Sequence, residues 1–142
     1  MTRIDFYVIP EAEDPGPVPL CCRLCEKSMK SGLKTYVWAP DGSLIDDVDA
    51  ALWTFRQGSF VAHEYAERCE DTDLTPVLLG RGEPPESHHG VLINLGGEVP
   101  DFFSRFERLL EIVCGDARAR ADSRKRFQFY RDRGYALETH KL

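Results

Sequence analysis

Long apolar runs are missing from this sequence of 142 residues. No stretch approaches the roughly 20 consecutive apolar residues that a membrane-spanning helix needs, which argues against an integral membrane protein. The first ten residues, MTRIDFYVIP, also lack the basic region and long apolar region of a secretory signal peptide, so we expect a cytoplasmic location. No internal repeat and no linker-like segment divides the chain. Residues 1–142 are therefore expected to form a single domain.

Cysteines are few and odd in number. The chain has five, and three of them, Cys21, Cys22 and Cys25, lie within the short stretch CCRLC. An odd count crowded in this way indicates reduced thiols rather than a disulfide framework. A structural zinc site needs four ligands, and no second CxxC accompanies Cys22 and Cys25. We expect these cysteines to pack inside a helix, with neither a bound metal nor a native disulfide.

Recognised catalytic motifs are also missing. His88 and His89 stand in a Gly/Pro-rich loop without an HExxH pattern, and Ser59 near His63 is not part of a GxSxG elbow. The glycines of LGRGEPP and LGGEVP match neither GxGxxG nor GxxxxGK[ST]. We therefore expect no active site and no cofactor. A nucleotide-binding α/β enzyme that uses these two glycine loops remains the alternative.

Strand-like and helix-like segments alternate along the chain. The expected strands are 3–9, 35–39, 60–63, 76–79, 91–95 and 135–139, and the expected helices are 20–30, 43–53, 100–114 and 116–133. Residues 64–75 are charged and aperiodic, which indicates a surface loop. Strand 3–9, helix 20–30 and strand 35–39 form a β-α-β unit, which predicts parallel pairing. The pattern predicts a three-layer Rossmann-like α/β fold, with a mostly parallel sheet and helices on both faces.

Charge is distributed unevenly along the chain. From residue 116 onward there are eight Lys/Arg and four Asp/Glu, a net charge of +4, whereas residues 1–115 hold 10 basic and 20 acidic residues, a net charge of −10. A basic helix on an acidic body can steer an anionic partner. The acidic body argues against a duplex-DNA binder, which usually has a pervasive basic surface. An acidic peptide is the better fit.

The basic helix carries a specific pattern. At 100° per residue, Arg120, Arg124, Gln128 and Arg131 fall on one stripe, and Phe127 lies at its edge. A cationic row beside an aromatic ring can hold a ligand that is both acidic and apolar. The alternatives are a solvated helix face that packs through its aromatic residues, and a track on which single-stranded DNA binds directly.

Several segments together resemble the chi subunit family of the bacterial DNA polymerase III holoenzyme. They are RIDFYVI, GLKTYVWAPD, DDVDAALWTFRQGSFVAHE, VLINLGGEVPDFF and RFQFYRDRGYAL. The similarity runs nearly from end to end and is weakest in the loops at 10–18 and 64–90. Membership would imply a non-enzymatic α/β domain that joins the clamp loader, through its psi subunit, to the acidic C-terminal tail of single-stranded DNA-binding protein. DNA would be contacted indirectly, through that protein.

The resemblance also implies two sets of site residues. For the tail site, it implies an apolar residue at the end of the penultimate helix and basic and aromatic residues of the last helix. These correspond here to Val113, Arg120, Arg124, Phe127 and Gln128, with Arg131 added on the same stripe. Phe127 stands where a Tyr is familiar and Gln128 where a Lys is familiar. For the psi subunit, the resemblance implies the aromatic pair Trp53 and Phe60.

Overall fold

The computed structural model describes residues 1–58 and 60–142, and Ser59 lies outside the described residues. Seven strands form one sheet: β1 (Arg3–Val8), β2 (Thr35–Trp38), β3 (His63–Tyr65), β4 (Val77–Gly80), β5 (Val91–Asn94), β6 (Arg108–Val113) and β7 (Ala136–Lys141). The helices are α1 (Val18–Lys30), α2 (Gly42–Thr54) and α3 (Ala117–Asp132), and the short 3₁₀ turns are η1 (Glu11–Glu13), η2 (Ala66–Arg68) and η3 (Phe103–Arg105).

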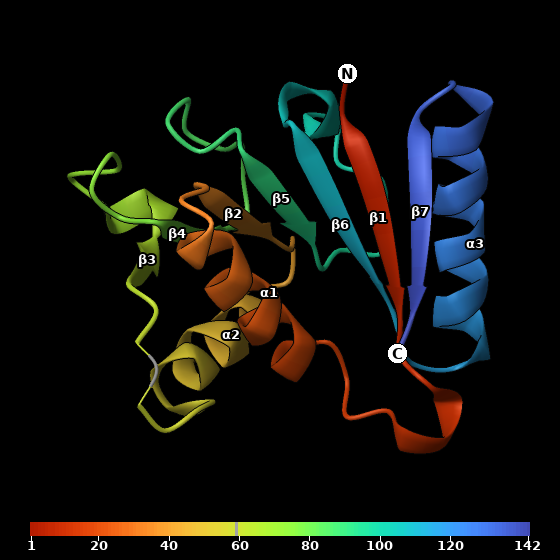
Figure 1. The fold of residues 1–142 in the computed structure, drawn as a ribbon, viewed down its shortest axis with the longest axis horizontal. Helices are drawn as coiled ribbons and strands as arrows, with labels where there is room; N and C mark the ends of the chain where they lie inside the picture. Colours follow the sequence, from red (N-terminus) through yellow and green to blue (C-terminus); the bar gives the residue numbers. More distant parts are fainter. Residues whose placement is uncertain (59) are drawn as a thin grey trace.

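The sheet is parallel throughout. Its strand order is β3-β4-β2-β5-β6-β1-β7, so β3 and β7 form its two edges. The central strands β2, β4 and β5 are buried along their whole length, as expected for parallel strands covered on both faces. The parallel arrangement brings the carboxyl ends of β1, β6 and β7 together at one end of the sheet (Figure 1).

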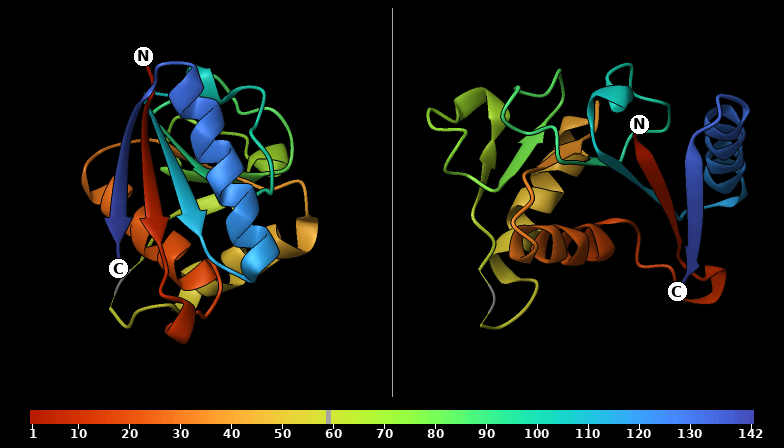
Figure 2. Two further views of the ribbon diagram at one scale, coloured as in Figure 1. Left: turned by 90° about the vertical axis from the view of Figure 1, so that its right-hand side faces the viewer. Right: turned by 45° about the horizontal axis from the view of Figure 1, so that its top comes forward.

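Helices cover both faces of the sheet, which confirms the predicted three-layer α/β fold. Helices α1 and α2 lie on one face, over a core that includes Val37, Val48 and Ile93. Helix α3 lies on the other face, beside β7, β1 and β6, as the turned view in Figure 2 shows. The core between α3 and the sheet is rich in aromatic residues and includes Phe6 and Tyr130.

The predicted helix at 100–114 is wrong. The segment forms the turn η3, followed by strand β6, which lies between β5 and β1. In β6 the side chains alternate: Leu109 packs on the α3 side and Leu110 on the α1 side. A strand buried on both faces reads as a continuous apolar run, and periodicity does not distinguish such a run from a buried helix.

Two smaller predictions also need correction. Strands β1 and β2 belong to the same parallel sheet but are not paired, because β5 and β6 lie between them. The strand expected at 60–63 begins at His63 and runs to Tyr65, so the segment 64–75 is not wholly a loop and also contains η2. The other predicted helices and strands are present, with ends that differ by one or two residues.

Candidate functional site

A pocket of about 530 Å³ lies between helix α3 and the strands β1 and β7. Its floor follows from the register of the sheet, because side chains two residues apart on a strand share a face. Val8 is the β1 partner of both Val113 on β6 and Lys141 on β7, and Phe6 pairs with Thr139. These five side chains line the pocket from below, at the carboxyl end of the strands.

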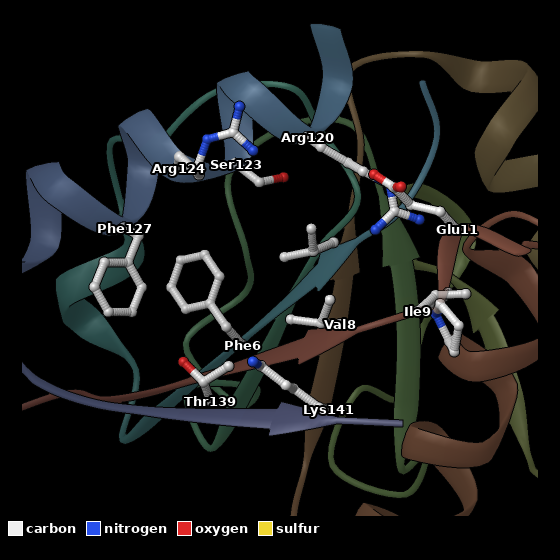
Figure 3. Close-up of a pocket in the computed structure, with 12 residues that line it drawn as sticks. Phe6, Val8, Ile9, Glu11, Arg120, Ser123, Arg124, Phe127, Thr139 and Lys141 are labelled. Atoms are coloured by element: carbon white, nitrogen blue, oxygen red, sulfur yellow. The ribbon is translucent and has the colours of Figure 1, made fainter. Parts of the chain in front are cut away.

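The wall of the pocket is formed by α3, which presents Arg120, Ser123, Arg124 and Phe127 to it (Figure 3). Asp116 caps the helix by accepting a hydrogen bond of 2.9 Å from the Ala119 amide. The Phe127 ring meets the Phe6 ring edge to face, with 5.1 Å between centroids. This pair gives the pocket an aromatic end.

Arg120 also lines the pocket, but the structure holds it in an internal network. It is 6% exposed, its Nε donates to the Gly115 carbonyl at 3.0 Å, and a terminal nitrogen donates to Asp14 at 2.9 Å. Glu11 lies 3.9 Å from Arg120 Nε. The amides of Gly115 and Gly16, together with Arg120, hold the pKa of Asp14 below its usual value. Arg120 therefore anchors the loop that carries η1 against the pocket.

Arg124 and Lys141 have a different environment. Both are exposed and both line the pocket. Within residues 1–58 and 60–142, neither has an ion-pair partner closer than 4.0 Å, in contrast to Arg120. The pocket thus combines an apolar floor with two cationic side chains that are available to an anion.

Gln128 and Arg131 do not line this pocket. Arg131 donates to the Gln128 side-chain oxygen at 2.8 Å, and Gln128 donates to Asp132 at 2.6 Å. The two side chains form an exposed network on the outer surface of α3. Val113 lines the pocket, and it ends strand β6 rather than a helix.

The second predicted site is an exposed aromatic pair. Trp53, near the end of α2, is 57% exposed, and Phe60 is 64% exposed, with 6.0 Å between their ring centroids. Beneath them the His63 ring lies 4.7 Å from Trp53 and is fixed by Asp49 at 3.1 Å and by the Val61 carbonyl at 2.7 Å. Large exposed rings on a supported base are typical of protein interaction surfaces.

The other candidates from the sequence have structural roles among the described residues. Cys21, Cys22 and Cys25 are fully buried in the core beneath α1. His88 is buried between the Ser87 hydroxyl at 2.7 Å and the Thr75 carbonyl at 2.6 Å.

One glycine in each of the two glycine loops is explained by aromatic packing, namely Gly80 at the end of β4 and Gly96 after β5. A Cβ atom on Gly80 would lie 2.2 Å from the Tyr36 hydroxyl, and one on Gly96 would lie 2.7 Å from the Trp38 ring. Both distances are too short for a side chain, so the two positions require glycine for packing. These glycines therefore give no specific support to a phosphate-binding loop.

One group of side chains has metal-ligand chemistry. The ligand atoms of Asp5, Glu138 and His140 lie within 4.8 Å of one another. The Asp5 carboxylate already accepts hydrogen bonds from Arg108 at 2.8 Å and from His140 at 3.0 Å. Burial alone would raise the pKa of Asp5, but these two bonds hold it below its usual value. Asp5, Arg108 and His140 therefore form a hydrogen-bonded network that ties β1 to β6 and β7.

Sequence reasoning missed several residues of the pocket. Thr139 and Lys141 share one face of β7, but the strand was expected to end at residue 139. The alternation of strand side chains, continued by one step, would have found Lys141. The sequence gives Glu11 no visible role, because its contact with Arg120 joins residues far apart in the chain. No local pattern signals such a contact.

No helix in the described part of the chain is long and apolar enough to cross a membrane.

The fold and the site together define a seven-stranded, all-parallel α/β domain with a cation-rimmed apolar pocket at the carboxyl ends of β1, β6 and β7. Residues 1–138 match the family described as "DNA polymerase III chi subunit, HolC".

Curated relatives agree with this match. The chain is 42% identical to the DNA polymerase III subunit chi of Pseudomonas aeruginosa over 142 residues, which is 100% of this chain and 98% of the relative. It is 23% identical to the subunit chi of Haemophilus influenzae over 137 residues, covering 96% and 95% of the two chains. With the subunit chi of Escherichia coli it shares 24% over 120 residues, covering 84% and 82%. The chain belongs to the DNA polymerase III chi subunit family, which confirms the resemblance and indicates an accessory role in DNA replication with protein partners in the replisome.

Proposed function

We propose that this protein is a non-enzymatic scaffold subunit that links the clamp-loader complex to single-stranded DNA-binding protein. Its pocket binds the acidic C-terminal tail of the DNA-coating protein, and its Trp53–Phe60 surface binds a psi-like subunit. DNA is reached indirectly, through the coating protein. The observation that carries the proposal is the apolar pocket whose rim holds Arg124 and Lys141, two cations with no ion-pair partner among the described residues.

The chemistry of the pocket suits a tail that ends in Phe after several acidic residues. Val8, Val113 and Phe127 offer apolar contact for the final ring, and burying such a ring contributes about 1.5–3 kcal/mol. Arg124 presents a planar fork that matches the two oxygens of a terminal carboxylate. After the cost of ordering a flexible tail, we expect a binding free energy on the order of −8 kcal/mol, which is micromolar affinity.

The two surfaces lie at opposite edges of the sheet. The pocket adjoins edge strand β7. Trp53 lies on α2, and its ring contacts that of His63, the first residue of edge strand β3 (Figure 1). Because β3 and β7 are separated by five other strands, a partner on one surface leaves the other surface uncovered. This separation supports a linking role, since a linker must hold both partners at once.

Calorimetric titration with a synthetic peptide ending in Asp-Asp-Asp-Ile-Pro-Phe tests the tail site. We expect micromolar binding, and at least about a tenfold loss when the final Phe is removed, because the ring supplies much of the buried apolar surface. Equal affinity for the two peptides would contradict the proposal. The full single-stranded DNA-binding protein, with and without its last residues, provides the corresponding pull-down.

The two alternative functions have their own tests. A clear thermal shift with one member of a nucleotide panel would favour a nucleotide-binding enzyme that uses the loops after β4 and β5. Tight binding of a naked oligonucleotide, in the absence of the coating protein, would favour a direct single-stranded DNA binder. We expect neither result.

A further inference from the structure

Cations line the tail pocket both from α3 and from the sheet. Arg124 extends from α3 on one side, and Lys141 extends from β7 on the other, with Phe6 and Val8 of β1 between them (Figure 3). We propose that Lys141 is a second specificity-determining residue of this site, whose ammonium binds a carboxylate of the tail opposite Arg124. This inference rests on the proposed tail-binding function and adds a residue to it.

Three cations line the pocket, Arg120, Arg124 and Lys141, and they differ in their ion pairs. Arg120 is buried, is bonded to Asp14 at 2.9 Å and has Glu11 at 3.9 Å, so its charge is already balanced by two carboxylates. A further carboxylate at Arg120 would meet these two acids at close range. Arg124 and Lys141 have no such partner in the described part of the chain. An acidic ligand therefore gains most by lying between Arg124 and Lys141.

The backbone of Lys141 is held in place. Lys141 is the register partner of Val8 in the parallel ladder, and the next amide, that of Leu142, donates to the Val8 carbonyl at 3.1 Å. The side chain leaves the strand on the face that also carries Thr139, toward α3. A lysine stem can lie along apolar surface while its ammonium stays in water, and Val8 offers such a surface here.

The two cations differ in the recognition that they provide. The Arg124 guanidinium can form two parallel hydrogen bonds with one carboxylate, whereas the Lys141 ammonium is a compact charge that accepts many geometries. Lys141 is exposed, so its contribution should be that of a solvent-accessible ion pair, about fivefold in affinity at low salt. It should decrease as salt is added, because the Debye length shortens from about 30 Å to 3 Å between 0.01 and 1 M.

Lys141→Met tests the proposal, since it removes the charge and keeps an apolar stem. Lys125→Met is the matched control, because Lys125 is exposed on α3 but does not line the pocket. In calorimetric titrations with the acidic tail peptide at low salt, we expect Lys141→Met to weaken binding about fivefold and Lys125→Met to change it by less than about twofold. Equal effects of the two variants would overturn the proposal, because only general charge would then matter.

Modified peptides identify the carboxylate. If Lys141 binds the terminal carboxylate, Lys141→Met has no effect on a peptide with an amidated C-terminus; if it binds an aspartate, the effect disappears with Asp→Asn peptides. An effect that persists with both modifications would contradict an ionic role. Arg124→Ala separates the test of Lys141 from the test of the proposed function. If Arg124→Ala weakens tail binding and Lys141→Met does not, only the role of Lys141 is refuted. Failure of the unmodified protein to bind any tail peptide refutes the proposed function.

Discussion

The pocket beside β7 and the aromatic pair beside β3 expose apolar groups in different ways. In the pocket, the Phe127 ring is partly covered and packs at 5.1 Å against Phe6, and cations stand at the rim. At the other edge, Trp53 and Phe60 are 57% and 64% exposed and neighbour the acidic residues of α2, including Asp49. One surface is concave and basic; the other presents two protruding rings in an acidic setting.

This difference indicates two kinds of partner. A concave pocket of about 530 Å³ can enclose the end of a flexible chain, and its cations select an anionic end. Protruding rings have no pocket of their own and gain burial only when a shaped surface covers them, as hot-spot residues do in protein interfaces. Under the proposed function, the pocket takes the transient tail and the ring pair takes the stably bound subunit.

Phe60→Ala should have the largest effect, and only on the aromatic surface. Because Phe60 is 64% exposed, we expect the fold to be retained, while association with a psi-like subunit weakens by at least about 2 kcal/mol. Leu74→Ala is the control, since Leu74 is 78% exposed elsewhere. Binding is measured by biolayer interferometry, and tail-peptide affinity should be unchanged. Equal losses in both assays would remove the distinction between the two surfaces.

Arg120→Ala should act on stability rather than on recognition. The substitution leaves Asp14 and the Gly115 carbonyl without their buried partner, which should lower the free energy of unfolding by about 1–2 kcal/mol. Urea denaturation measures this change. Arg124→Ala, which removes an exposed side chain, should leave the unfolding midpoint nearly unaltered. If Arg120→Ala unfolds like the parent protein, Arg120 does not anchor the η1 loop.

The Asp14 contact makes a pH-dependent contribution to stability. The folded protein holds the pKa of Asp14 below its usual value of 3.8, through the amides of Gly115 and Gly16 and through Arg120. A depressed pKa in the folded state stabilises the protein above pH 3.8, and the contribution is lost as the pH falls through the folded value. The stability difference between the parent protein and Asp14→Asn should therefore shrink in acid. Urea denaturation at pH 7 and pH 3 would show a constant difference if the contact contributes nothing.

Gln128→Lys should give the smallest effect. Gln128 lies outside the pocket and is bonded to Arg131 and Asp132, so an added charge there reaches the tail only at long range. We expect a gain in tail affinity of a few tenths of a kcal/mol at low salt, and almost none at high salt, where screening is strong. Titrations at the two salt concentrations measure it. A large gain that survives high salt would place Gln128 in direct contact with the tail.

Much of the fold could be predicted from the sequence because its local signals are strong. Short apolar strands, the cap at Asp116 and the stop at Gly134 gave the layer architecture and the limits of α3. The segment that became β6 was misassigned because a strand buried on both faces has no polar alternation, and its one acid, Glu111, is itself buried. The direction and neighbours of strands depend on the whole sheet, so the pairing of β1 with β6 and β7 could not be read locally.

The pattern of α3 indicated some of the residues that line the pocket, but it also indicated Gln128 and Arg131, which do not line it. Arg124 and Phe127 follow from the pattern of α3. The hydrogen bond from Arg120 to Asp14 joins residues 106 positions apart, and it gives Arg120 an internal partner that the helix pattern does not reveal. Lys141 reaches the pocket through the pairing of β7 with β1, which also spans most of the chain. Helical periodicity places residues on a face but does not show which of them are already paired.

We propose that α3 and the β1–β7 floor form the tail site, with Arg124 as its main cation. Calorimetric titration of the acidic tail peptide into Arg124→Ala tests it most directly, with Arg118→Ala as a control that removes an exposed arginine outside the pocket. We expect Arg124→Ala to lose at least about 1.5 kcal/mol of binding free energy, the low end for a charged hydrogen bond, and Arg118→Ala to lose much less. If Arg124→Ala binds the tail as the parent protein does, the site lies elsewhere.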